Sequence, residues 1–229
     1  MRHRLVTVLL VVLTAATAAC SSEDDRTRAA PRAPTVTTRT LVADPASTAP
    51  STSTSVQPAV VPIPYRIERR THDDATSDFE AVVTTTLADP RGWTRARFAF
   101  DRTEDGPYLI VLAEGADVDA LCRPYDTGGK YSCQNGPVVA LNADRWRTAT
   151  PKWTGDLDTY RRMLVNHEVG HLLGMKHPRP QCPAPGRPAP IMNQQSTELD
   201  GCLPNPWPLD DEIENASRHD RPLAPGPGE

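Results

Sequence analysis

The feature that most constrains this chain is an eleven-residue stretch, His167 to His177, which reads His-Glu-Val-Gly-His-Leu-Leu-Gly-Met-Lys-His. On an α-helix, His167 and His171 lie one turn apart on the same face, so both imidazoles can reach one ion. Gly174 can adopt a left-handed backbone that ends the helix, and the chain can then bring His177 back to the same point. Because Pro178 cannot continue a helix, the pattern predicts three convergent histidines at a helix end.

This combination of residues indicates a catalytic metal rather than a structural one. Three imidazole ligands with an open fourth position are typical of catalytic zinc sites. Glu168 is adjacent to the first histidine and is rotated away from the ligand face, where its carboxylate could hold a water molecule and take its proton. The stretch therefore predicts one catalytic Zn²⁺ bound by His167, His171 and His177, with Glu168 as the general base for a zinc-activated water.

The eleven residues resemble the extended motif of the metzincin clan of zinc metalloproteases, which a methionine-containing turn follows in the chain. The segment Pro190-Ile191-Met192-Asn193-Gln194, fifteen positions after His177 at its methionine, resembles that Met-turn. The wider stretch 137–207 looks like a family of uncharacterised exported actinobacterial proteins, and this likeness continues more weakly back to about Tyr65.

The resemblance implies an α+β, metzincin-like zincin fold. Such a fold has a mixed, twisted sheet, an active-site helix, a Met-turn and a C-terminal helix. Met192 would lie beneath the histidines, and residues 193–200 are candidates to shape the substrate pocket. The additional tyrosine ligand that often follows the Met-turn in metzincins is absent, because no tyrosine follows Met192.

Hydrophobic patterns predict the elements of this fold. Strands are expected at 65–68, 95–100, 108–113 and 138–141. A helix capped by Asp78 should end near Asp89, the active helix should begin at Asp156 or Asp158, and 209–216 should form the closing helix. Arg161 and Arg162 are expected on a solvated helix face, and Trp146, Trp153 and Trp207 in packing roles.

The ends of the chain are expected to lie outside the folded domain. Residues 1–19 have a basic start, a short apolar run and small residues, which is typical of an export signal and too short for a permanent membrane span. Residues 20–62, rich in Ser, Thr, Pro and Ala, predict a disordered tether. Residues 63–217 suit one metallopeptidase domain, and 218–229 a disordered tail.

Five cysteines give further information on location and fold. Thr17-Ala18-Ala19-Cys20 resembles a bacterial lipobox except at Thr17, so the protein is either a surface lipoprotein anchored through Cys20 or secreted. The other four suggest disulfides in an exported chain. The local pairing, Cys122–Cys133 and Cys182–Cys202, is favoured over the two other pairings, and the lack of close Cys-x-x-Cys spacing argues against a second zinc site.

The predicted function is that of an extracytoplasmic zinc-dependent peptidase, most simply an endopeptidase, acting on peptide or protein substrates as a monomer. Two alternatives are a surface-tethered, zinc-containing binding or scaffold protein without turnover, and a zinc amidase acting on a non-peptide or cell-wall amide. The formal net charge of −4 and the absence of a basic cluster do not favour nucleic-acid binding. Membrane contact is expected only through a lipid at Cys20.

Overall fold

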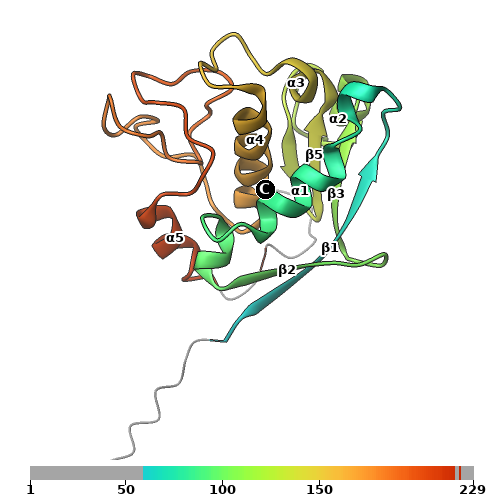
Figure 1. Ribbon diagram of the computed structural model, residues 1–229, viewed down its shortest axis with the longest axis horizontal. Coiled ribbons are helices and arrows are strands. Elements are labelled where there is room, and N and C mark those ends of the chain that lie inside the picture. The colour runs from blue at the N-terminus through green and yellow to red at the C-terminus, as the bar shows by residue number, and fades with distance from the viewer. Residues whose placement is uncertain (1–58, 220–221, 223–229) are drawn as a thin grey trace, which may run out of the picture. The chain divides into compact units, whose positions relative to one another are not determined.

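The computed structural model describes residues 59–219 and Pro222. The predicted export signal, Cys20, nearly all of the tether and most of the tail fall outside these residues. The described elements run from Val61 to Ala216 (Figure 1). Among the described residues, no helix has the length and apolar character needed to cross a membrane.

A five-stranded mixed sheet forms the centre of the fold, in the order β2-β1-β3-β5-β4. The first four of these strands run parallel, and the edge strand β4 pairs antiparallel with β5. The α+β fold with a mixed, twisted sheet, an active-site helix and a C-terminal helix is therefore as expected. The strands are β1 (Val61–Arg69), β2 (Phe98–Arg102), β3 (Tyr108–Ala113), β4 (Cys133–Asn135) and β5 (Val138–Asn142).

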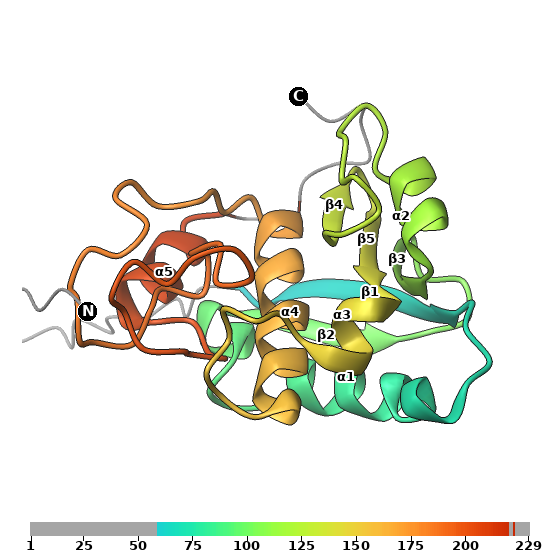
Figure 2. The ribbon, with the colours of Figure 1, turned by 90° about the horizontal axis from the view of Figure 1, so that it is seen from above.

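Helices cover both faces of the sheet (Figure 2). On one face, Ile110 and Leu112 of β3 join the main core with α1 and α4. On the other face, Leu109 and Val111 pack with Val118 of α2. Burial on both faces explains why β3 reads as a continuous apolar run. The helices are α1 (Phe79–Ala88), α2 (Gly115–Leu121), α3 (Ala143–Thr148), α4 (Leu157–Leu172) and α5 (Asp210–Ala216).

Details of the first half differ from expectation. β1 begins at Val61 and not at residue 65, so residues 61–62 belong to the sheet and not to the expected tether. The strand expected from residue 95 begins at Phe98, because a 3₁₀ turn occupies Trp93–Ala96 and Arg97 has a φ of 70°. Asp78 precedes α1 but does not cap it. Its carboxylate instead accepts hydrogen bonds from the Trp146 indole (3.1 Å) and from Arg161 (2.6 Å).

The prediction for Arg161 was therefore wrong. Its side chain is only 11% exposed, and its guanidinium also donates to the backbone carbonyls of Trp146 and Ala75. It was expected on a solvated helix face, but the segment before α1 covers that face. Arg162 remains partly exposed beside Asp158 (3.4 Å).

The active helix α4 has clear end signals. The Asp156 carboxylate accepts a hydrogen bond from the Thr159 amide at 2.7 Å, which makes Asp156 the cap rather than Asp158. At the other end Gly174 has a φ of 89°, and the Met175 amide donates to the Gly170 carbonyl. This left-handed turn brings His177 back toward His167 and His171, as the motif predicted.

Between α4 and α5 the described chain contains no helix or strand, only an isolated bridge between Pro188 and Leu203. Buried amide side chains stabilise it: Gln195 binds the Pro190 and Asn205 carbonyls, and Asn205 binds the Ala189 carbonyl. The disulfide Cys182–Cys202 closes the same segment. These side-chain hydrogen bonds satisfy backbone carbonyls that would be paired within a helix or sheet in a regular segment.

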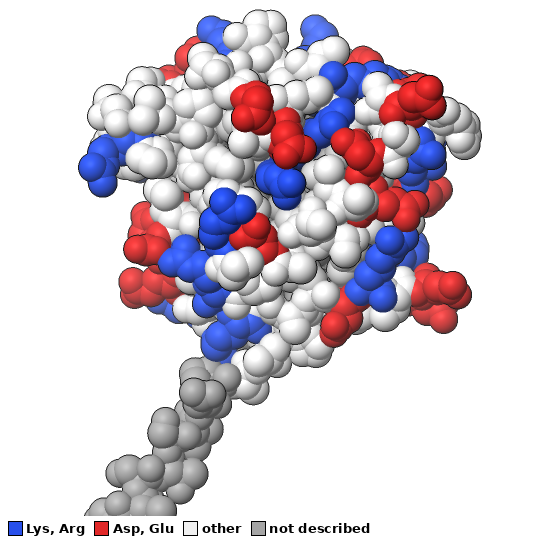
Figure 3. Space-filling view, in the orientation of Figure 1, with Lys and Arg blue, Asp and Glu red and all other residues white. Residues whose placement is uncertain are grey.

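Basic and acidic side chains are interspersed over the face shown in Figure 3. Several surface pairs are ion pairs at close range, including Arg91–Asp89 (2.8 Å) and Arg102–Glu80 (2.5 Å). Arg147 alone contacts Asp73, Glu114 and Asp144. The positive charges of these arginines are therefore neutralised by nearby carboxylates.

Candidate metal centre

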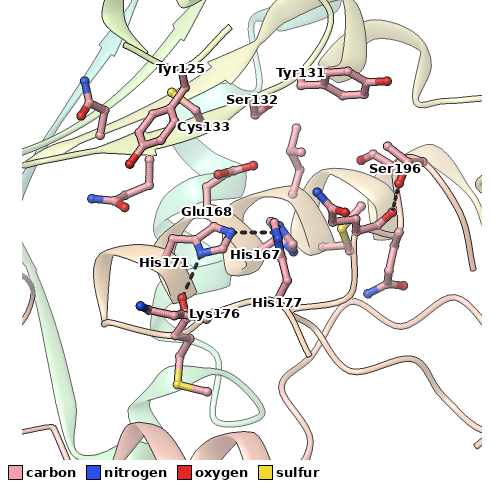
Figure 4. Close-up of a pocket in the computed structure, with 18 of the residues that line it drawn as sticks. Tyr125, Tyr131, Ser132, Cys133, His167, Glu168, His171, Lys176, His177 and Ser196 are labelled. Atoms are coloured by element: carbon pink, nitrogen blue, oxygen red, sulfur yellow. Dashed lines mark hydrogen bonds between the residues drawn. The ribbon is translucent and has the colours of Figure 1, made fainter. Parts of the chain in front are cut away.

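The three motif histidines converge on one point. The Nε2 atoms of His171 and His177 are 3.1 Å apart, and those of His177 and His167 are 3.3 Å apart. All three residues offer a ligand atom within 4.8 Å of the others. Figure 4 shows the imidazoles facing one another at the base of a pocket. The structure thus brings together the residues that the motif predicts as ligands.

The remaining ring nitrogens define the tautomers. His167 Nδ1 lies 2.8 Å from the Ile191 carbonyl, and His171 Nδ1 lies 2.9 Å from the Met175 carbonyl. A carbonyl only accepts, so each Nδ1 carries the proton and each Nε2 presents a lone pair to the centre. Lone pairs facing one another at such distances repel unless a cation lies between them.

This donor set fits zinc. Two nitrogens about 2.05 Å from one ion at a tetrahedral angle lie about 3.3 Å apart, which matches the spacings here. Burial lowers the pKa of His167 to about 3, with the neighbouring His171 charge contributing, and lowers the pKa of His171 to about 4. Burial also lowers the pKa of His177. All three imidazoles are therefore neutral near pH 7, the form that binds a metal.

Glu168 is the carboxyl group of the site. It is 5% exposed, and burial raises its pKa to about 8. Figure 4 shows its side chain directed from α4 into the pocket, toward the wall that carries Ser132 and Cys133. Glu168 follows His167 directly on α4, but its carboxyl group is directed away from the point where the imidazoles meet. It can therefore contact a water molecule or a substrate in the pocket rather than the ion.

Met192 packs against the middle of the motif. It is 1% exposed, and a Cβ placed on Gly170 would lie 2.4 Å from the Met192 sulfur and 2.9 Å from Trp93 Cζ2. A larger residue at position 170 would therefore force the Met192 or Trp93 side chain to move. Trp93 also donates its indole N–H to the Asn166 carbonyl at 2.9 Å, so Met192 and Trp93 both pack against the part of α4 that carries the first two histidines.

Glu212 is a site-supporting residue that the sequence did not reveal. Its carboxylate accepts hydrogen bonds from the amides of Ile191 (2.8 Å), Met192 (2.9 Å) and Leu209 (2.9 Å). Burial raises its pKa, and these backbone donors oppose that shift. Its position in the first turn of α5 is a typical capping position, but its contact with the Met192 loop depends on tertiary structure.

A cleft of about 710 Å³ lies above the histidines. Residues 131–136, which include β4, line one part of it, and Gln194 to Thr197, within the stretch named as pocket candidates, line another. Tyr125 and Tyr131 are 43% and 45% exposed on the rim. Neither tyrosine nor β4 was anticipated, because the loop before β5 carries no strong periodic pattern.

Both disulfides join elements of this site, in the pairing that the sequence favoured. Cys122–Cys133 connects the end of α2 to β4 in the cleft wall. Cys182–Cys202 closes the loop that contains Met192. Each bridge therefore restrains one part of the cleft lining.

The model of one protein family matches residues 43–212, more than half of the chain. This family is described as "Protein of unknown function (DUF3152)", and the chain belongs to it. No curated protein sequence matches the chain. Among solved structures, the crystal structure of archaemetzincin (amzA) from Methanopyrus kandleri is similar, with a TM-score of 0.43 and 12% identity, over 69% of this chain and 94% of that chain. A likeness at this level indicates neither activity nor substrate.

Proposed function

We propose that this member of the family is a zinc-dependent peptidase of the metzincin type, with His167, His171 and His177 as metal ligands. The observation that carries the proposal is the convergence of three neutral imidazole nitrogens beside a buried carboxyl group, at the base of an open cleft. A purely structural zinc site is normally closed by a fourth protein ligand. Among the described residues, the ligand cluster contains only the three histidines.

Glu168 is the general base in this proposal. Zinc, when bound, supplies a Lewis acid that acidifies water and polarises a carbonyl. Glu168 accepts the proton of a water that attacks the scissile carbonyl carbon, and then delivers that proton to the leaving nitrogen. Its buried position makes the carboxylate a stronger base than a solvated one, because burial raises its pKa.

The shape of the cleft supports an endopeptidase. In the view of Figure 4, Tyr131 and Ser196 lie on one side of the histidines, and Tyr125 and Lys176 lie on the other. A substrate chain could therefore continue in both directions from the reacting bond. The predicted export signal and the two disulfides support action outside the cytoplasm, with Cys20 as the proposed lipid anchor.

The test is mass-spectrometric cleavage of a diverse peptide library by the zinc-loaded full-length protein and its Glu168→Gln variant. We expect the wild type to cleave, and the variant to retain zinc while losing about 10²–10⁴-fold in rate. Glu214→Gln, at an exposed position of α5, is the matched control and should cleave normally. Equal turnover by Glu168→Gln would remove Glu168 from the mechanism. Zinc binding without cleavage by the wild type would instead favour an amidase or a tethered binding protein.

A further inference from the structure

Arg145 differs from the nearby Arg147 and Arg161 in the partners of its guanidinium group. Arg145, in α3, lines the cleft. Its Nε donates to the Lys130 carbonyl at 2.8 Å and its Nη1 donates to the Ala149 carbonyl at 3.3 Å. Two backbone acceptors on different sides hold the guanidinium in place. Its orientation is therefore fixed without any carboxylate.

The positive charge of Arg145 is not neutralised by an acidic partner. No carboxylate of residues 59–219 forms an ion pair with it. By contrast, Arg147, two positions later, contacts three carboxylates, and Arg161 contacts Asp78. Within the described part of the chain, Glu168 is the only carboxyl group that lines the cleft, and it is assigned to catalysis. Arg145 thus retains N–H donors and a full charge for a ligand.

The surroundings of Arg145 place it at one end of the cleft. Lys130, its acceptor, precedes Tyr131 in the chain. The charge of Arg145 opposes the rise that burial causes in the pKa of Tyr160, whose hydroxyl lies 2.9 Å from the Ser196 hydroxyl. We call the part of the cleft formed by Arg145, Tyr131 and Ser196 the Arg145 end. In Figure 4 Tyr131 and Ser196 lie away from Tyr125 and Lys176, across the histidines.

We infer, on the basis of the proposed peptidase function, that the substrate presents a carboxylate to Arg145, so that this residue selects peptides with an acidic group on the Arg145 side of the scissile bond. A planar guanidinium with free donors binds a carboxylate in a defined, often bidentate geometry. The hydroxyls of Tyr131 and Ser196 can donate further hydrogen bonds to the same group. The carboxylate belongs either to an Asp or Glu side chain or to the C-terminus of the substrate.

The first test measures kcat/KM of the zinc-loaded full-length protein on peptide pairs that differ only by Glu or Gln at successive positions on both sides of the cleaved bond. Each pair is made with a free C-terminal carboxylate and with a C-terminal amide. We expect a preference of about 10–100-fold for the acidic member at one position on one side. A preference for the free C-terminus instead identifies the terminal carboxylate as the group bound. Equal rates for all pairs overturn the inference while leaving the peptidase function intact.

Variants connect the preference to Arg145. Arg145→Gln should reduce the preference to near unity and Arg145→Glu should reverse it, whereas Arg145→Lys should keep part of it because the charge remains. Arg187→Gln removes an exposed arginine outside the cleft and should leave the preference unchanged. Zinc affinity and thermal midpoints of all variants, measured in parallel, show whether each one folds. A preference that persists in a folded Arg145→Gln variant assigns selectivity to another residue.

A binding measurement separates this inference from the proposed turnover. Zinc-loaded Glu168→Gln is titrated with fluorescent Glu and Gln peptides, with and without the additional Arg145→Gln change, and anisotropy is recorded. Tighter binding of the Glu peptide that depends on Arg145 supports the inference even if the wild type cleaves no peptide. Equal affinities for both peptides contradict it, whatever the activity.

Discussion

Replacing Glu212 by alanine tests how the C-terminal helix supports the metal site. The carboxylate connects α5 to the Ile191 and Met192 amides, and the Ile191 carbonyl in turn accepts the Nδ1 proton of His167. The variant leaves these two buried amides without an acceptor, together with the partly buried amide of Leu209. Glu212 is therefore connected to His167 through Ile191, whose amide binds Glu212 and whose carbonyl binds His167.

The expected loss follows from this count. An unsatisfied buried donor costs about 1–3 kcal/mol, so the two buried amides together cost about 2–6 kcal/mol, and a loss of about 3 kcal/mol is a conservative expectation. For a domain of 150–250 residues this corresponds to a fall of about 6–12 °C in thermal midpoint. Because the Ile191 backbone loses its anchor, the carbonyl that orients His167 is expected to shift, and zinc binding should weaken by about tenfold, the lower end of the range for groups that orient a ligand.

The assay combines calorimetry of the zinc-free protein with zinc affinity measured by competition with a chromogenic chelator. Glu214→Ala is the control, since Glu214 is exposed on the same helix and forms an exposed ion pair with Arg218; it should change stability by less than about 1 kcal/mol. A Glu212→Ala variant that loses stability but binds zinc as the wild type does would show that Glu212 holds α5 and not the ligand. An unchanged midpoint would refute the hydrogen-bond argument itself.

Three further predictions concern the packing, the disulfide and the metal. Gly170→Ala should destabilise the protein by about 1–3 kcal/mol through overpacking against Met192, measured by chemical denaturation; an unaltered midpoint would mean that the contact between Gly170 and Met192 is loosely packed. Replacing Cys122 and Cys133 together by serine should cost about 3 kcal/mol by the chain-entropy model and raise KM more than it lowers zinc affinity, because the bridge restrains the cleft wall; the reverse pattern would contradict that placement. Chelation of zinc present at about 1,000 times its Kd should remove about 4 kcal/mol of stability, seen as a midpoint about 8–16 °C lower; identical scans with and without chelator would argue against a metal bound to the native state.

Local patterns were sufficient for those parts of the fold whose determinants are close in sequence. The buried face of α1, the run that forms β3 and the end of α4 at Gly174 each follow from residue spacing and backbone preference over one or two turns. Local patterns were not sufficient to predict the environments of Arg145, Arg147 and Arg161. All three are arginines on helices, and their different environments depend on which distant carboxylates the fold brings near them.

The sequence alone therefore determined the residues of the candidate metal centre: the three histidines, the adjacent glutamate and the glycine that lets the chain turn back. These residues lie within eleven positions, so the helix end and the left-handed turn at Gly174 fix their arrangement with little help from the rest of the chain. The tertiary structure decided what surrounds that chemistry, namely the β4 wall, the support from Glu212 and the unpaired charge of Arg145. Those features arise from contacts between segments far apart in the chain, and no local periodicity encodes which segments meet.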